Sequence, residues 1–128
     1  MTILKGSNAF SGFSVNDLAK AKEFYSGTLG LQIEDGPQGV ILKVAGPNGV
    51  FMYAKENHEP ATYTILNFRV DDIDAAVDDL AAKGITFEHY TGMTDTKGIA
   101  RGLAAGQGPD IAWFKDPAGN YLSVLKDA

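Results

Sequence analysis

Few side chains in this sequence could carry acid–base or metal chemistry. It has two histidines, His58 and His89, and no cysteine, which excludes thiolate metal sites and cysteine nucleophiles. His58 lies in the polar segment KENHEP, where a solvated loop histidine is the plain interpretation. His89 follows Glu88, but adjacent strand residues point to opposite faces and cannot readily share one metal ion. We expect no histidine-based metal cluster, and His89 stays open as a packed residue or a lone acid or base.

A glycine-rich segment offers a candidate anion-binding residue. Residues 91–109, TGMTDTKGIARGLAAGQGP, contain five glycines and separate two expected strands. Long irregular connections in compact domains are often lids or binding loops, and disorder is the alternative that the sequence leaves open. Within this segment, Arg101 could pair with a carboxylate or phosphate of a ligand, or it could simply be solvated.

The composition is that of one globular domain. Of the 128 residues, 45% are hydrophobic and 21% are charged, enough for a single core and too few for two ordinary domains. The formal charge of −5 disfavours nucleic acid, because phosphates would be repelled. No stretch approaches the roughly 20 apolar residues of a membrane span. We expect a chain that binds neither nucleic acid nor membranes and lies in the cytoplasm, a location that the absence of cysteine fits.

An internal repeat indicates which elements must position these residues. The segment FSVNDLAKAKEFYSGTLGLQIE from Phe13 matches FRVDDIDAAVDDLAAKGITFE from Phe68, with one extra residue near the helix end of the first copy. Each copy begins with alternating apolar residues, typical of a strand, and continues with apolar residues at helical spacing. Asparagine or aspartate before each helix can cap it, and a glycine ends it. Each copy should therefore be one half of the domain.

Three further strands are expected after each helix. The first would cover residues 31–34 in one half and 85–90 in the other. The next two would be joined by the turns GPNG, residues 46–49, and DPAG, residues 116–119, in which proline presets φ and glycine relieves strain. Each half is then a strand, a helix and three strands, which predicts an α+β fold.

These phrases, together with WFKDPAGNYLSVL, resemble the vicinal-oxygen-chelate superfamily of glyoxalase, bleomycin-resistance and ring-cleaving dioxygenase proteins. The resemblance runs from Phe10 to Lys126. It implies one domain over residues 1–128, with one βαβββ module at about 8–56 and a second at about 62–127. In that superfamily the modules form a curled mixed sheet, or cup, with helices on the convex face and the ligand in the concavity. The resemblance does not settle the function.

Metal-using members of the superfamily carry His or Glu at four inward positions, on the first and last strands of each module. Carried over to this sequence, those positions hold Phe10, Tyr53, Ile65 and Ser123. Phenyl and sec-butyl groups offer no lone pair, and the two hydroxyls would need large pKa depressions without help from a stronger ligand. The resemblance thus leads us to expect no metal site and no cofactor.

Strand alternation predicts which side chains share the concave face. Residues two apart lie on one face, and the opposite parity is apolar and should pack beneath the helices. Aromatic walls with a few polar groups are typical of a small-molecule pocket, and a cup filled by its own side chains is the alternative. The candidate ligand-binding residues are Phe10, Phe51, Tyr53, Ile65, Asn67, Arg101, Trp113, Tyr121 and Ser123.

We favour a glyoxalase/bleomycin-resistance-like protein that binds a small hydrophobic or aromatic molecule in the cup without a metal. One alternative is a metal-dependent lyase, isomerase or dioxygenase of the same superfamily. Another is a metal-free enzyme that uses His89, Tyr53 or Arg101. Whether the chain is an enzyme, and which residues would be catalytic, stays open. We also expect a homodimer, because the usual pairing of such modules buries strand edges.

Overall fold

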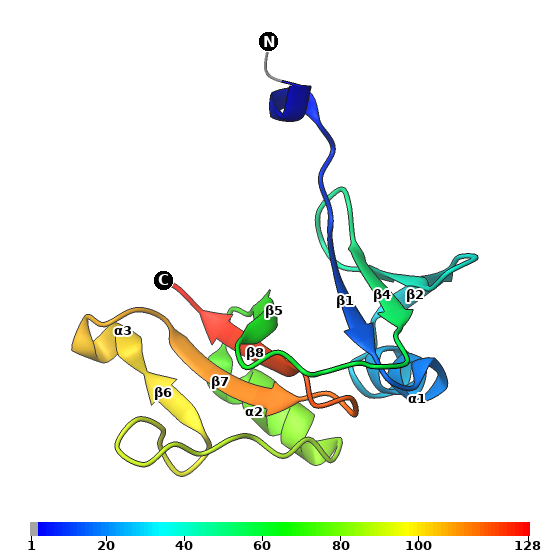
Figure 1. The fold of residues 1–128 in the computed structure, drawn as a ribbon. Coiled ribbons are helices and arrows are strands. Elements are labelled where there is room, and N and C mark those ends of the chain that lie inside the picture. Colours follow the sequence, from blue (N-terminus) through cyan, green and yellow to red (C-terminus); the bar gives the residue numbers. More distant parts are fainter. Residues whose placement is uncertain (1–2) are drawn as a thin grey trace. The chain divides into compact units, whose positions relative to one another are not determined.

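The computed structural model describes residues 3–128, which form two compact units (Figure 1). Unit 1 ends at Glu59, and unit 2 is Pro60–Ala128. Each unit contains helices and one four-stranded sheet with parallel and antiparallel neighbours. The predicted α+β class is therefore confirmed, and unit 1 has the predicted order of a strand, a helix and three strands. Unit 2 also has three strands after its helix α2, but the first of them lies within residues 91–109 and is followed by a further short helix.

Unit 1 follows the predicted order. Asp17 caps its helix by accepting a hydrogen bond from the N–H of Lys20 at 3.1 Å. The strands lie in the order β1-β4-β3-β2, with β1 and β4 parallel and the other neighbours antiparallel. The elements are η1 (Ile3–Gly6), β1 (Ser11–Val15), α1 (Leu18–Lys22), η2 (Glu23–Thr28), β2 (Gln32–Asp35), β3 (Val40–Lys43) and β4 (Val50–Ala54).

The extra residue of the first repeat copy lies close to a widened helical turn. After α1 the helix continues as the π-helical segment η2, and the N–H of Leu29 donates to the carbonyl of Phe24 at 2.9 Å. A π turn closes over one residue more than an α turn. Tyr25 within it is fully buried, with its ring centroid 5.7 Å from that of Phe13 on β1. The helix can thus absorb the added residue and still place an aromatic ring against the sheet.

Unit 2 repeats the pattern. Asp72 caps α2 by accepting a hydrogen bond from the N–H of Ala75 at 3.0 Å. The strands lie in the order β5-β8-β7-β6, and α2 packs against β7 and β8 (Figure 1). The elements are β5 (Thr64–Arg69), α2 (Ile73–Ala82), β6 (Ile99–Arg101), α3 (Gly102–Ala105), β7 (Asp110–Lys115) and β8 (Tyr121–Lys126).

The strand predicted at residues 85–90 is wrong in extent. Only Phe87 forms a bridge with Phe114 of β7, and the N–H of Glu88 donates to the carbonyl of Trp113 at 2.8 Å. The chain then turns, because the carbonyl of Tyr90 accepts the N–H groups of the residues three and four positions later. This turn leads the backbone away from β7 before a full strand can form.

The glycine-rich segment 91–109 is ordered. Its middle part, β6, pairs antiparallel with the opposite end of β7, from Asp110 to Ala112. The short helix α3 follows directly and ends at Gly106, whose φ of 67° is readily adopted only by glycine. The segment thus contains a short strand and a short helix that form part of unit 2, and a role as a lid or binding loop stays a prediction.

The predicted division between the two faces of each sheet holds for the core. Of the residues that alternation assigns to the helix-facing side, Leu66, Phe68 and Val70 are half-buried. The fully buried ones are Phe13, Val15, Met52, Phe114, Leu122 and Val124.

No helix among residues 3–128 is long and apolar enough to cross a membrane.

A β-bulge interrupts the alternation in β5. The register runs from Thr64 opposite Tyr121 to Leu66 opposite Leu122, so Ile65 is the additional residue. Thr64 therefore lies opposite Tyr121. Period-two counting cannot reveal such a bulge, and ligand binding by Ile65 stays a prediction.

The Asp-Pro-Ala-Gly-Asn motif, part of the family resemblance, is a structural turn. Asp116 is 4% exposed, and its Oδ1 accepts the N–H groups of Ala118 and Asn120, both at 2.9 Å. Its Oδ2 accepts the side-chain amide of Asn120 at 3.0 Å. The carboxylate thus organises the turn between β7 and β8.

Candidate functional site

One face of the unit 2 sheet brings together three of the predicted site residues. The register places Asn67 beside Ser123, and Ser123 beside Trp113. Ser123 is fully buried, and its hydroxyl donates to Oδ1 of Asn67 at 2.5 Å. Its strand neighbours Leu122 and Val124 are buried on the other parity, the one predicted to pack beneath the helix.

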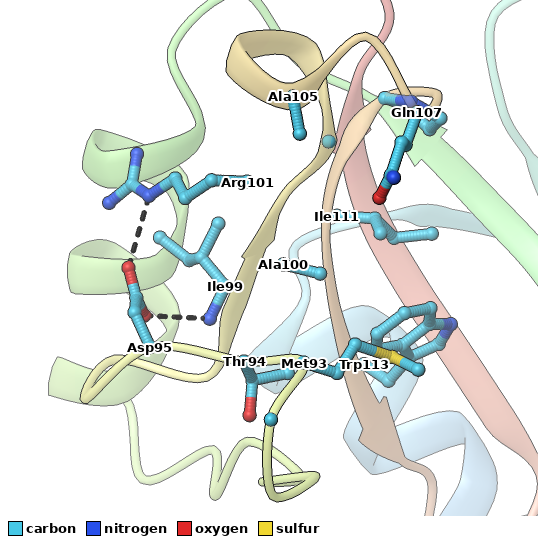
Figure 2. Close-up of a pocket in the computed structure, with 13 residues that line it drawn as sticks. Met93, Thr94, Asp95, Ile99, Ala100, Arg101, Ala105, Gln107, Ile111 and Trp113 are labelled. Atoms are coloured by element: carbon cyan, nitrogen blue, oxygen red, sulfur yellow. Dashed lines mark hydrogen bonds and ion pairs between the residues drawn. The ribbon is translucent and has the colours of Figure 1, made fainter.

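Two open pockets lie beside Trp113, and we call them together the aromatic groove. The large pocket, of about 830 Å³, lies over β6 and β7, and Figure 2 shows Ala100, Ile111 and Trp113 on the strands beneath it. The small pocket, of about 340 Å³, lies by the starts of β5 and β8. Trp113 and Met93 line both. The large pocket is also lined by Gly92, Thr94, Asp95, Ile99, Ala100, Arg101, Gly102, Ala105, Gln107, Pro109 and Ile111, and the small one by Thr62, Tyr63, Thr64, Tyr90 and Tyr121.

Aromatic rings shape the small pocket. The ring of Tyr90 lies 5.7 Å from that of Trp113 at an interplanar angle of 77°, an edge-to-face contact. The ammonium group of Lys115 lies 5.0 Å from the ring centroid of Tyr121 and 3.7 Å from a carboxylate oxygen of Glu88. Burial raises the pKa of Tyr90, and Tyr121 and Glu88 raise it further. Tyr121 and Glu88 also raise the pKa of Lys115, so the phenol of Tyr90 is neutral and Lys115 is charged at neutral pH.

The guanidinium group of Arg101 does not point into the groove. Its Nη1 and Nη2 donate to the two carboxylate oxygens of Asp74 on α2, at 2.9 and 2.8 Å. Its Nε donates to Asp95 at 3.0 Å. Figure 2 shows this group on the α2 side of β6, away from Ile111 and Trp113. Arg101 thus joins β6 to α2, while its side chain stays 40% exposed at the edge of the large pocket. Ligand binding by Arg101 stays a prediction.

Lys97 completes an ion-pair network that we call the Asp74 clasp, made of Asp74, Asp78, Asp95, Lys97 and Arg101. The ammonium group of Lys97 lies 2.9 Å from carboxylate oxygens of both Asp74 and Asp78. Oδ1 of Asp95 accepts the N–H groups of Lys97 and Ile99 at 2.9 Å. Hydrogen bonds from Arg101 and Lys97 hold the pKa of Asp74 well below its usual range. The clasp fixes the segment leading into β6 against the start of α2.

The four positions inherited from metal-using relatives do not fit a metal ion. Phe10 lies just before β1, is 68% exposed and offers no lone pair, and neither does Ile65. The hydroxyl of Ser123 is already engaged with Asn67, and Tyr53 is the remaining oxygen donor. Among residues 3–128, no three histidine, aspartate or glutamate side chains are placed to hold a metal ion. We therefore derive no chemistry through a metal.

The predicted site residues of unit 1 lie on β4 and just before β1. The rings of Phe51 and Tyr53 are stacked, with centroids 5.6 Å apart at 20°. Ser14, opposite Tyr53 in the register, places its Oγ 2.6 Å from Nδ1 of His58. His58 is therefore half-buried and bound to a strand residue, which corrects its interpretation as a solvated loop histidine. Ligand binding by Phe10, Phe51 and Tyr53 stays a prediction.

The residues considered for metal-free catalysis do not gather in the groove. His89 is exposed and lines a separate cavity of about 240 Å³ beside α2, together with Asp78 and Lys97. Arg101 is held in the clasp, and Tyr53 belongs to unit 1. Of these three residues, Arg101 is the one that lines a pocket of the groove, and the alternative of a metal-free enzyme stays a prediction.

Sequence reasoning missed several lining residues. Ile111 lies two residues before Trp113 on one strand, so alternation could have found it. Tyr90, Met93 and Gln107 lie within or beside the glycine-rich segment, where no periodicity signals which way a side chain points.

The fold and the groove define a two-module βαβββ protein, and comparison with known proteins identifies its family. The model of the Glyoxalase/Bleomycin resistance protein/Dioxygenase superfamily matches residues 9–124. The chain belongs to this superfamily. None of the curated proteins compared with the chain matches it.

Solved structures share the fold at low sequence identity. An antibiotic-binding protein from a Streptomyces species, TnmS3, is 23% identical over 96% of this chain and 98% of that one, with a TM-score of 0.67. A lactoylglutathione lyase from Agrobacterium tumefaciens is 21% identical over 94% and 93%, with a TM-score of 0.65. The fosfomycin resistance protein FosX from Listeria monocytogenes is 13% identical over 96% and 94%, with a TM-score of 0.68. These similarities show the fold and leave the reaction open.

Proposed function

We propose that the chain binds a flat, largely apolar small molecule in the aromatic groove without a metal ion. The observation that carries this proposal is the position of Trp113, which borders both pockets and has Tyr90 packed edge-to-face against it. A large ring at the junction of two open pockets offers a stacking surface for a planar ligand. Tyr121 lines the small pocket, and Asn67 and Ser123 lie on the same face of the sheet without lining either pocket, so a role of these two in ligand binding stays a prediction.

The charges of the large pocket support an apolar ligand. Asp95 and Arg101 both line this pocket, and they are bound to each other and to neighbouring groups of the clasp. An ionised ligand group there would lose water without gaining a free counter-charge. The antibiotic-binding protein from Streptomyces shows that this fold serves at least one protein named for binding a small molecule, which fits the proposal.

The proposal is tested with N-phenyl-1-naphthylamine, a neutral aromatic probe whose emission rises in apolar surroundings. We expect saturable binding that weakens at least tenfold in Trp113→Ala, because the central stacking surface is lost. Met93→Ala should weaken binding less, since Met93 is 59% exposed. Treatment with EDTA should leave the affinity unchanged.

Leu103→Ala is the matched control, because Leu103 is an exposed apolar residue of α3 that lines neither pocket. Equal affinity in the wild type, Trp113→Ala and Met93→Ala would contradict binding in the groove. Loss of binding after EDTA treatment would contradict metal independence and favour the metal-dependent alternative.

We also propose that the protein is a cytoplasmic homodimer. β1 and β5 are end strands of their sheets, so each has one edge without a strand partner within its described unit. Such edges favour association with another strand. Sedimentation equilibrium giving the mass of one chain would contradict the dimer, and fractionation that places the protein outside the cytoplasm would contradict the location.

A further inference from the structure

We infer that Gln107 determines ligand specificity. Its side-chain amide would form hydrogen bonds with an amide or lactam group, that is, an adjacent N–H and C=O, on an uncharged planar molecule. This inference rests on the proposed function and specifies the ligand class of the same groove. It rests on the hydrogen-bonding state of the polar side chains that line the large pocket. Apart from the indole of Trp113, these are Thr94, Asp95, Arg101 and Gln107.

Three of these four side chains are used by the protein itself. The hydroxyl of Thr94 accepts the N–H of Tyr90 at 2.8 Å and donates to the carbonyl of Tyr90 at 3.3 Å. Asp95 accepts two backbone N–H groups and the Nε of Arg101. The other two guanidinium nitrogens of Arg101 are bound to Asp74. All three are therefore held by bonds within the protein, and the remaining N–H groups of Arg101 belong to the guanidinium that lies on the α2 side of β6.

Gln107 differs from them. Figure 2 shows its side chain running from the α3 end of the pocket toward Ile111. Its backbone N–H donates to the carbonyl of Gly102 at 2.9 Å, which fixes the residue where α3 ends. The side-chain amide itself forms no hydrogen bond with any residue in 3–128.

The chemistry of the amide then sets the ligand class. A glutamine amide presents an acceptor oxygen and a donor NH₂ side by side, which match an adjacent N–H and C=O on a ligand. Ala100, Ile111 and Trp113 supply an apolar surface beneath it, suited to an aromatic ring fused to that polar edge. An ionised ligand would find no free counter-charge among these side chains.

The test compares two probes that differ in one donor. 2-Quinolinone carries a lactam N–H and C=O on a planar bicycle, and N-methyl-2-quinolinone lacks the N–H. Binding is followed by quenching of Trp113, the single tryptophan of the chain. We expect the wild type to bind 2-quinolinone about tenfold more tightly than its N-methyl analogue, because a site built to hydrogen-bond rejects a ligand without the donor.

In Gln107→Leu, which keeps a similar volume without hydrogen bonding, the preference should fall to about one. The affinity for the N-methyl analogue should stay the same, which also shows that the variant is folded. A tenfold preference that survives in Gln107→Leu would overturn the role of Gln107. Equal binding of both probes by the wild type would overturn the lactam specificity and leave the proposed binding function intact. Failure of both probes, together with failure of N-phenyl-1-naphthylamine, would overturn the proposed function as well.

Discussion

Arg101 on β6 holds Asp74 at the start of α2 through two parallel hydrogen bonds, of 2.9 and 2.8 Å. Paired bonds of this kind fix the orientation of both groups, and Lys97 adds a third contact to the same carboxylate. The segment that forms one wall of the aromatic groove is thus tied to the helix by charge.

Asp74→Asn should loosen this wall. The substitution keeps the size of the side chain and removes its charge, so amide hydrogen exchange should accelerate in residues 95–101 while the core strands β7 and β8 keep their protection. Asp79→Asn on the same helix is the control, because Asp79 lies outside the clasp and forms an exposed pair with Lys83. Equal exchange in both variants would show that the clasp does not hold the segment.

The clasp should also make stability depend on pH. The folded-state pKa of Asp74 lies below its usual value, mainly through hydrogen bonds from Arg101 and Lys97. Its contribution is therefore fully present above the unfolded-state pKa of roughly 3.9 and is lost as the pH falls toward the folded-state pKa. The midpoint of urea unfolding should be higher in the wild type than in Asp74→Asn at pH 7, and this difference should shrink below about pH 4. A difference that is constant from pH 7 to pH 3 would contradict this origin.

Asp116→Ala should be strongly destabilising. Asp116 is 4% exposed, and its removal leaves the N–H groups of Ala118 and Asn120 without their acceptor. We expect a loss of about 3 kcal/mol in the free energy of unfolding, as is typical for breaking a buried hydrogen-bond network. Denaturant unfolding measures the loss, and Asp127→Ala, which breaks an exposed pair with Arg69, should change stability little. A loss below about 1 kcal/mol would mean that another group or water replaces the carboxylate.

Gly102, the first residue of α3, and Gly106, directly after α3, should respond differently to alanine. A Cβ at Gly102 would lie 2.5 Å from the carbonyl oxygen of Pro109, so the connection to β7 must shift and probe binding in the groove should weaken several-fold. At Gly106 the space is open, but the φ of 67° costs about 1 kcal/mol with alanine. Gly106→Ala should therefore lower the melting temperature and leave probe affinity within about twofold. The reverse pattern would contradict the placement of α3.

The inherited ligand positions should take up no metal. After incubation with zinc, nickel, manganese or iron(II) and desalting, elemental mass spectrometry should find far less than one metal per chain, because Phe10 and Ile65 cannot coordinate one. Near-stoichiometric metal would contradict the prediction that these positions bind no metal and would favour the metal-dependent enzyme.

Much of the fold could be predicted because it depends on local patterns. The aspartates that cap α1 and α2, and the prolines and glycines of the hairpin turns, act through neighbouring backbone groups, so their signals survive in the sequence. Burial of Phe13, Leu122 and Val124 followed from strand alternation alone.

The site was less predictable because it depends on tertiary contacts. Whether Arg101 faces a ligand or α2 is decided by Asp74, which lies 27 residues earlier and gives no sequence signal of the pairing. The bulge at Ile65 interrupts the alternation of side chains between the two faces of β5, and no glycine in the sequence marks its position. Gln107 and Met93 follow no period, so only the folded backbone shows that they line the groove.

The clasp has a consequence for how this protein can diversify. The wall formed by residues 91–109 is attached to α2 through ion pairs at the surface, whereas β7 and β8 are held by buried apolar residues such as Phe114 and Leu122. Substitutions in the wall can therefore alter the shape of the groove while the folding core stays unchanged. If the proposed binding is confirmed, residues of this wall are the ones at which ligand preference can change without loss of the folding core.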